Sequence, residues 1–251
     1  MTLSTLSIST LGTTLNITLN RIEVRNAINM KMCEELITTF ATLNNESPYR
    51  TVVIRGAGPT FSAGVDIKEL SEKPTDWVMK RRNYGLDAFL AIERCPLPVI
   101  GVVHGAVFGA GAEIAAACDF LIATDSAVFQ WPEALRGAVG ATQRLPRTVG
   151  RQMAKELLFT ARKISALEAL SIGFVNHVVP SESLTSEIEN TVASIERCGP
   201  VAIRLIKQAI NLGENRDRVS AIDLERQFIA QSLLHDEWKS AVDDFHRNPR
   251  S

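Results

Sequence analysis

The feature that most constrains the fold is an apolar strand that runs directly into a glycine-rich loop and then a helix. Residues 98–103 read Pro-Val-Ile-Gly-Val-Val, the following loop contains Gly105, Gly109 and Gly111, and residues 112–118 are mostly small helix formers. A strand that is apolar on both faces is typical of a parallel sheet covered by helices on both sides. The segment therefore predicts a buried parallel strand whose loop opens a helix at the carboxyl edge of a sheet.

The first two thirds of the chain repeat this alternation of strands and helices. Residues 3–20 alternate in period two around Gly12, which predicts two strands joined by a tight turn. Apolar residues recur every three or four positions from residue 28 to 43, which predicts a helix capped by Asn26 or Asn29. Further strands are expected at 51–54, 98–103 and 120–123, with a helix at 76–94. The pattern predicts an α/β fold with a largely parallel sheet.

The last third of the chain is mostly helical. Helices are expected at 153–160, 166–171, 183–197, 201–212 and 219–234, and a short strand at 174–179. We therefore expect an α/β catalytic core over residues 1–190 and a helical assembly region over 191–251, packed on the core or on a neighbouring subunit.

Composition excludes several classes of partner. Lys and Arg number 27 against 28 Asp and Glu, a net charge of −1, so no global field draws in nucleic acid or anionic lipid. No stretch reaches the ~18 apolar residues of a membrane span, and no secretory or transit signal is expected at the N-terminus. The four cysteines form no CxxC pair and the four histidines have no metal-ligand spacing. We expect a cytoplasmic protein without a metal.

A second segment resembles the glycine loop. Phe61-Ser62-Ala63-Gly64-Val65-Asp66-Ile67 follows the strand at 51–54, so both loops are expected at the same edge of the sheet. A dinucleotide fingerprint needs a small residue at 114, which is Ile, and a P-loop needs Gly-Lys at 110–111, which are Ala-Gly. The remaining interpretation is that one N–H from each loop holds a single carbonyl oxygen. Alternatively, the glycines only allow close packing of helix on sheet, and Asp66 caps a helix.

Two glutamates lie near this edge in apolar surroundings. Glu113 falls in the first turn of the helix that the glycine loop opens, and Glu133 follows Trp131-Pro132. Burial among apolar residues raises a carboxyl pKa toward the range useful for acid–base catalysis. The alternatives are that Glu113 complements the helix dipole and that Glu133 is a surface acid. No G-x-S-x-G elbow is present. We interpret His104 as structural and Lys80-Arg81-Arg82 as a solvated helix face.

These segments together resemble the crotonase superfamily, the enoyl-CoA hydratases and isomerases, over about residues 6–248. The resemblance rests on the two loops and on the following segments: Leu19-Asn20-Arg21, Arg25-Asn26-Ala27-Ile28-Asn29, Cys118-Asp119, Pro132-Glu133, Thr142-Gln143-Arg144-Leu145 and Ala166-Leu167-Glu168-Ala169-Leu170. It implies a crotonase-like spiral of ββα units with a helical C-terminal trimerisation region, assembled as a homotrimer or a dimer of trimers.

The resemblance also implies roles for individual residues. The backbone N–H groups of Val65 and Ala110 would form an oxyanion hole, and Glu113 and Glu133 match the hydratase acid pair. The substrate would contact Arg25, Ala27, Ala63, Asp66, Ile67, Lys68, Gly109, Trp131 and Arg136. Coenzyme A would enter as part of an acyl-CoA thioester, with no permanently bound cofactor. A C-terminal helix at 236–248 would reach a neighbouring site, where Lys239, Arg247 or Arg250 would meet phosphates.

The retained acid pair favours a hydro-lyase that adds water across the 2,3 double bond of an enoyl-CoA thioester through an enolate. The alternatives are a double-bond isomerase, a thioester or C–C hydrolase, and a non-catalytic relative that binds acyl-CoA or RNA. The stretch between Glu133 and Thr142 is shorter than is usual in the family, and Arg136 replaces a residue that is commonly aliphatic or lysine. We hypothesise that Arg136 favours a carboxylated or polar acyl group.

Overall fold

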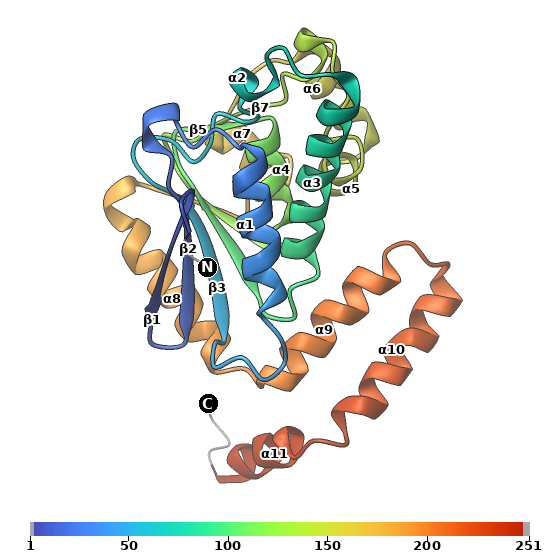
Figure 1. Ribbon diagram of the computed structural model, residues 1–251. Coiled ribbons are helices and arrows are strands. Elements are labelled where there is room, and N and C mark those ends of the chain that lie inside the picture. Colours follow the sequence, from blue (N-terminus) through green and yellow to red (C-terminus); the bar gives the residue numbers. More distant parts are fainter. Residues whose placement is uncertain (1–2, 248–251) are drawn as a thin grey trace.

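The computed structural model describes residues 3–247, which form an α/β core with a helical arm (Figure 1). A six-stranded sheet has the order β1 (Leu6–Leu11), β2 (Thr14–Leu19), β3 (Thr51–Gly56), β4 (Val99–Val103), β6 (Phe120–Thr124), β9 (His177–Val179). β1 and β2 form the predicted antiparallel hairpin, and all other neighbours are parallel. The carboxyl ends of β3, β4 and β6 therefore open on one edge.

Helices cover both faces of this sheet. On one face lie α1 (Met30–Ala41), α3 (Thr75–Glu93) and α4 (Ala110–Ala117), and on the other lies α8 (Leu184–Glu196), as Figure 1 shows. All five residues of β4 are buried, as its apolar sequence predicts. Asn29 caps α1, because its side chain accepts a hydrogen bond from the Met32 N–H at 2.9 Å.

A second, smaller sheet stacks the glycine loops beside one another. It contains β5 (Ala106–Phe108), β7 (Val128–Gln130) and β8 (Ile164–Ser165), and single bridges extend it through Ser62–Val107 and Ile28–Val65. β2, β3 and β4 are each followed by a short extended segment in this second layer and then by a helix, which is α1, α2 and α4 respectively. This repetition confirms the crotonase-like α/β fold. The sequence did not predict β5, since three residues between two glycines give no period.

The remaining core helices are α2 (Ile67–Leu70), α5 (Arg144–Val149), α6 (Arg151–Thr160) and α7 (Ala166–Ser171). α5 was not predicted from the sequence, because a proline such as Pro146 usually ends or interrupts a helix. Pro146 is the third residue of α5, in the first turn, where a backbone N–H has no partner within the helix and its loss costs nothing.

The solvated-face prediction for Lys80-Arg81-Arg82 is wrong for its middle residue. The Arg81 side chain is buried, donates to the Ile28 carbonyl and pairs with Glu69 at 3.4 Å. Glu69 in turn accepts the Met30 N–H at 2.9 Å, at the start of α1. Arg81 therefore ties α3 to the segment that precedes α1.

Three helices form an arm that extends from the core (Figure 1): α9 (Pro200–Gly213), α10 (Arg218–Ser232) and α11 (Glu237–Arg247). Lys207 of α9 pairs with Asp119 at 2.7 Å. The expected division at residue 190 falls inside α8, whose Ile188 and Val192 pack on the sheet. We therefore propose that the assembly region begins at Gly199, where α8 has ended. Asn248, the last residue of the expected C-terminal helix, and Arg250 after it lie outside the described residues.

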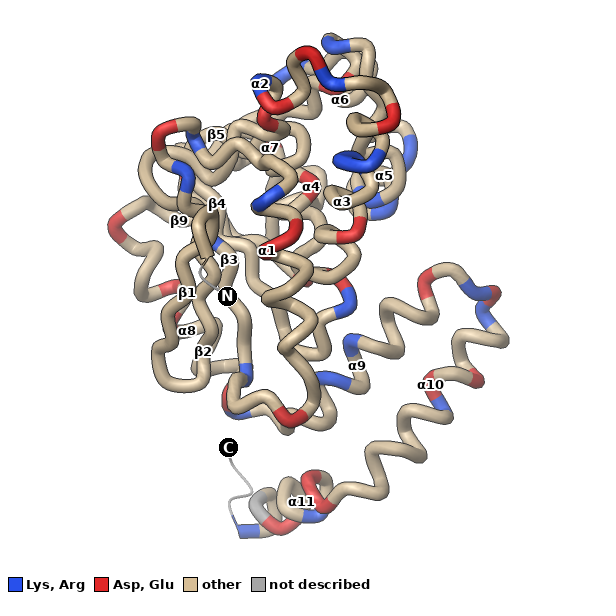
Figure 2. The backbone as a smooth tube through the Cα atoms, viewed as in Figure 1, with Lys and Arg blue, Asp and Glu red and all other residues tan. Residues whose placement is uncertain are grey.

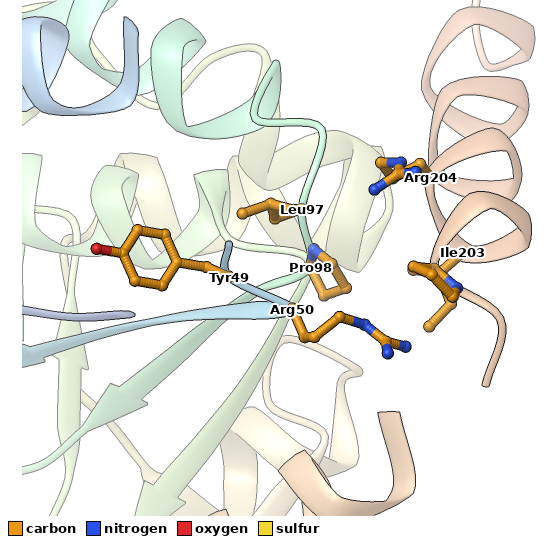
Figure 3. Close-up of a pocket in the computed structure, with 7 residues that line it drawn as sticks. Tyr49, Arg50, Leu97, Pro98, Ile203 and Arg204 are labelled. Carbon is orange, nitrogen blue, oxygen red and sulfur yellow. The ribbon is translucent and has the colours of Figure 1, made fainter. Parts of the chain in front are cut away.

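A small pocket lies where α9 meets the core (Figure 3). It is lined by Tyr49, Arg50, Leu97, Pro98, Pro200, Ile203 and Arg204. Tyr49 and Arg50 precede β3, and Leu97 and Pro98 precede β4. The pocket therefore lies at the amino ends of these strands, opposite the edge that carries the glycine loops. In residues 3–247, no helix is long and apolar enough to cross a membrane.

Candidate active site

The two glycine loops are in direct contact at the carboxyl edge of the sheet. The Ser62 N–H donates to the Ala106 carbonyl and the Phe108 N–H to the Ser62 carbonyl, both at 3.0 Å. Gly64 has φ +92°, and a Cβ there would lie 2.7 Å from the Phe108 oxygen and 3.6 Å from the Ala110 nitrogen. Only glycine permits this approach, which brings the residue after Gly64 and the start of α4 together.

Two backbone donors remain free at this contact. The N–H groups of Val65 and Ala110 have no acceptor among the residues the structure describes. The neighbouring amides are satisfied, because the Ile28 N–H donates to the Gly64 carbonyl at 2.8 Å and the Asp66 N–H donates to the Ile28 carbonyl at 3.0 Å. Ala110 is the first residue of α4, where the aligned peptide dipoles add positive potential. A developing negative charge on an oxygen held by both donors would be stabilised.

Glu113 lies one turn into α4, with 6% of its surface exposed. Its Oε2 accepts a hydrogen bond from Arg144 Nη1 at 3.3 Å, and its Oε1 has no partner among the described residues. Burial raises the pKa of Glu113 to about 7, against the opposing effect of Arg144. The negative charges of Glu133 and Glu93 raise this pKa further. At neutral pH this carboxyl can both take and give a proton.

Glu133 begins the turn Ala134–Arg136, and two glycines surround it. A Cβ at Gly109 would lie 3.1 Å from Glu133 Oε1, and one at Gly140 would lie 2.9 Å from Glu133 Cγ. Its Oε2 is buried without a partner among the described residues. Burial raises the pKa of this carboxyl, while Arg136 and Arg82 oppose the rise. Since Gly109 precedes Ala110, the second acid lies near the peptide that carries the free Ala110 N–H.

The segment before α1 runs alongside the first glycine loop. The Ala63 N–H donates to the Arg25 carbonyl at 2.9 Å, and the Ile28 N–H donates to the Gly64 carbonyl. Asn26 holds the segment in place, with its amide donating to the Ala57 and Thr60 carbonyls at 2.8 and 2.9 Å. The structure therefore brings together two regions that the sequence separates, around Arg25–Ala27 and Ala63–Lys68.

The other expected substrate residues have mixed surroundings. Asp66 is ion-paired with Arg21 at 2.9 Å, while Ile67 and Lys68 of α2 and Arg136 are exposed. Trp131 is fully buried and packs edge-on against Phe174, with ring centroids 5.1 Å apart. In this structure Trp131 therefore supports the core behind Glu133. His104 donates from Nε2 to the Gly58 carbonyl oxygen, 2.8 Å away, which agrees with a structural role.

Sequence reasoning assigned no role to Arg144 or Glu93, and it placed Arg82 on a solvated helix face. Arg144 stands in the Thr142–Leu145 motif, which carried the resemblance, and the motif was the only available signal. Glu93 on α3 binds Arg144, and Arg82 on α3 donates to the Val139 carbonyl at 3.2 Å, in the short stretch after Glu133. Among residues 3–247, no group of three or more His, Cys, Asp or Glu side chains is placed to hold a metal ion.

Comparison with known proteins identifies the family. A family model described as enoyl-CoA hydratase/isomerase matches residues 10–249. The chain belongs to the enoyl-CoA hydratase/isomerase family. The expected membership of the crotonase superfamily is confirmed, as is the expectation of an enoyl-CoA hydratase or a closely related isomerase.

Named members of this family are similar over most of the chain. A short-chain-enoyl-CoA hydratase of Clostridium acetobutylicum is 38% identical, over 91% of this chain and 89% of that protein. A mitochondrial Δ(3,5)-Δ(2,4)-dienoyl-CoA isomerase of Rattus norvegicus is 37% identical, over 81% of this chain and 66% of that protein. Both a hydratase and an isomerase therefore lie at similar identity.

Solved structures of the family have the same fold. The enoyl-CoA hydratase of Bacillus anthracis superposes with a TM-score of 0.94 at 32% identity, over 97% of this chain and 96% of that one. A Thermobifida fusca family member, solved in complex with acetoacetyl-CoA, has a TM-score of 0.83 at 30% identity, over 92% of this chain and 95% of that one. Figure 2 shows acidic and basic residues interspersed over the core of this chain, in line with its net charge of −1.

Proposed function

We propose that the protein is an enoyl-CoA hydratase that adds water across the 2,3 double bond of an enoyl-CoA thioester. The observation that carries this proposal is the pair of buried carboxyl oxygens, Glu113 Oε1 and Glu133 Oε2, which lack a partner in the described chain. Glu113 lies in the first turn of α4, the helix that begins with the free Ala110 N–H, and Glu133 lies beside Gly109, the residue before it. A buried polar atom without a partner is costly unless a ligand or water binds it.

The N–H groups of Val65 and Ala110 are proposed to hold the thioester oxygen. Attack of water at C3 moves electrons through C2 onto this oxygen, so an enolate charge develops where the donors point. Preorganised donors act on the charge of the transition state, and removing one such donor costs about 3 kcal/mol in known enzymes. Gly64 sets the spacing, because no side chain fits between its loop and Phe108.

The two acids are proposed to divide the proton transfers. We assign the base to Glu113, since Arg144 favours its ionised form, and this carboxylate takes a proton from the attacking water. We assign the acid to Glu133, whose buried Oε2 accepts no hydrogen bond from a cation in the described chain, and this carboxyl gives a proton to C2. The product carries a hydroxyl at C3 and one added hydrogen at C2, and the thioester stays intact.

Coenzyme A is proposed to follow the segments around Arg25–Ala27 and Ala63–Lys68. The exposed cations Arg25 and Lys68 flank this path and suit phosphate groups. The acetoacetyl-CoA bound to the Thermobifida fusca family member supports an acyl-CoA ligand. We propose coenzyme A as part of the substrate only, with no resident cofactor.

The acyl group is proposed to carry a carboxylate. Arg136 and Arg82 both act on Glu133, and neither has an ion-pair partner among the described residues. We expect Arg136→Ala to lower kcat/KM about fivefold for an ω-carboxylated enoyl-CoA and to leave crotonyl-CoA unchanged, because an exposed ion pair contributes up to about 1 kcal/mol. Arg147→Ala, on α5, is the control. An unchanged preference in Arg136→Ala would contradict this assignment.

The arm is proposed to assemble the protein as a homotrimer or a dimer of trimers. The arm leaves large apolar side chains in solvent, among them Ile206, Ile210, Leu212, Ile229, Leu233, Leu234 and Phe245. A second copy that covers them removes this apolar surface from water. We keep the cytoplasm as the proposed location, and Lys239 and Arg247 as proposed contacts to a neighbouring subunit's substrate.

The test is a product assay by mass on a panel of enoyl-CoA thioesters. We expect the mass of one water to be added by the wild type, and kcat to fall at least about a thousandfold in Glu113→Gln and Glu133→Gln, since each removes a proton-transfer group. The control is Glu46→Gln, an exposed glutamate in the loop before β3.

The second candidate is double-bond isomerisation, which the similarity to a dienoyl-CoA isomerase favours. Isomerisation changes no mass and needs one base, so a product of unchanged mass with an active Glu133→Gln variant would establish it. Full hydration activity in both glutamine variants would contradict the site. Binding of acyl-CoA without turnover across the panel would indicate a non-catalytic relative.

A further inference from the structure

One arginine connects three core helices beside the candidate base. Arg144, the first residue of α5, makes a two-pronged ion pair with Glu93 of α3, with Nε 2.6 Å from Oε1 and Nη2 3.1 Å from Oε2. Its third nitrogen, Nη1, donates to Glu113 Oε2 of α4 at 3.3 Å. The side chains of Arg144 and Glu113 are 11% and 8% exposed, so solvent screens this contact weakly.

The plane of the guanidinium is fixed from two sides. Its carbon lies 5.4 Å from the centre of the Phe89 ring, and Phe89 stands one helical turn before Glu93 on α3. A guanidinium held by a carboxylate fork and a ring face has little freedom left. Arg144 does not stabilise α5 through the helix dipole, because the positive N-terminal end of a helix repels a cation at its first position. The fixed plane directs Nη1 to Glu113.

The charges that face Glu113 come from three elements: Arg144 from α5, Glu93 from α3 and Glu133 from the turn after β7. Arg144 favours the ionised form of Glu113, and the two acids oppose it. Glu93 therefore acts in two ways that partly cancel. It holds the cation in place, and its own charge competes for that cation and repels a charge on Glu113.

We propose that Arg144 and Glu93 form a positioning pair that orients the Glu113 carboxylate and sets its degree of ionisation. Neither residue touches the reacting atoms. The pair acts through Glu113 alone, and its catalytic consequence rests on the base role given to Glu113 in the proposed function. The two members of the pair act in opposite directions, because Arg144 favours the ionised form of Glu113 and the charge of Glu93 disfavours it.

The experiment is a carboxyl titration by NMR on full-length protein with ¹³C-labelled glutamate, in which Glu113→Gln identifies the Glu113 signal. We expect the pKa of Glu113 to rise in Arg144→Gln, because the cation is lost, and to fall in Glu93→Gln, because a negative charge is lost and Arg144 is free to bind Glu113. Arg144→Lys is expected to give a smaller rise. Arg147→Gln, one turn later on α5 and bound to Glu214, is the matched control and is expected to give no shift.

The pH profile of kcat/KM provides the functional readout. We expect its acidic limb to move with the NMR titration, so that Arg144→Gln loses about tenfold near pH 6 for a rise of about one pH unit. KM is expected to change little. A merely structural pair would lower activity at every pH without moving the limb, and both variants would behave alike.

Shifts of the same sign, no shift in either variant, or an equal shift in Arg147→Gln would overturn the proposal. If Arg144→Gln does not fold, Glu93→Gln and Arg144→Lys still give shifts of opposite sign to compare. The NMR titration needs no turnover. The proposed hydration can therefore fail in the product assay while the positioning pair is confirmed, or the reverse.

Discussion

The two glutamates of the site are held in different ways. Glu113 stands on a helix packed between two others, and a clamped guanidinium contacts it at 3.3 Å. Glu133 stands on a single turn, its Oε2 has no partner in the described chain, and its nearest constraints are Gly109 and Gly140. The comparison teaches that a hydrogen-bonded cation orients the first acid, whereas the space that absent side chains leave determines where the second acid lies.

The largest expected effect is on the space around Glu133. Gly109→Ala introduces a Cβ 3.1 Å from Glu133 Oε1 at a residue with φ +50°, so both contact and backbone strain arise. We expect kcat/KM to fall up to about a hundredfold, because Glu133 must shift by a few tenths of an ångström while the strained backbone moves the adjacent Ala110 N–H, and a misplacement of about 1 Å has an effect of that size. Steady-state kinetics on an enoyl-CoA substrate measure it.

Two other glycines separate the causes. Gly140→Ala adds contact with Glu133 at a residue without a positive φ, and we expect about a tenfold loss. Gly137→Ala adds strain at φ +60° with nothing within 4 Å, and we expect activity near that of the wild type with about 1 kcal/mol lost from the free energy of unfolding. Equal losses of activity in Gly109→Ala and Gly137→Ala would show that backbone strain matters and that the space around Glu133 does not.

A smaller effect is expected on the pH dependence of stability, from Glu113. Its pKa of about 7 in the folded protein lies above the ordinary value, so the folded state binds an extra proton that the unfolded state has released. The resulting stabilisation is fully present below about pH 4.5 and is lost as the pH rises through about 7. Glu113→Gln removes this titration. The difference in unfolding free energy, variant minus wild type, is expected to increase by on the order of 2–3 kcal/mol from pH 5 to pH 8.

Urea denaturation across this pH range, at fixed protein concentration, measures the difference. Glu46→Gln, at an exposed position, is the control and is expected to follow the wild type. A constant difference between Glu113→Gln and the wild type would mean that folding does not raise the pKa of Glu113.

Much of the core was predictable because its signals are local. The period of two around Gly12, the buried strand at β4 and the helix period over α1 each depend on neighbouring residues, and the structure confirms them. The resemblance added Glu113 and Glu133 as a pair, and their apolar neighbours predicted raised pKa values, which the structure also shows for both.

The parts that were missed depend on contacts distant in the chain. Arg144 lies 51 residues from Glu93 and 31 from Glu113, so no period in the sequence links them. Arg81 reads as one of three exposed cations, yet it is buried because the Ile28 carbonyl and Glu69 receive its donors. A run of charged residues predicts exposed side chains only when no acceptor or opposite charge from another element binds them.

The sequence by itself determined the alternation of strands and helices, the family and the residues that can do acid–base chemistry, because composition and period act over a few neighbouring positions. Only the tertiary structure decided which loop touches which, that a Cβ at Gly64 or Gly109 has no room, and that one guanidinium serves Glu93 and Glu113 together. The physical reason is that space and charge at the site come from α3, α4, α5 and the glycine loops at once. Both the space and the charge at the site are therefore fixed only when folding of the sheet brings these elements together.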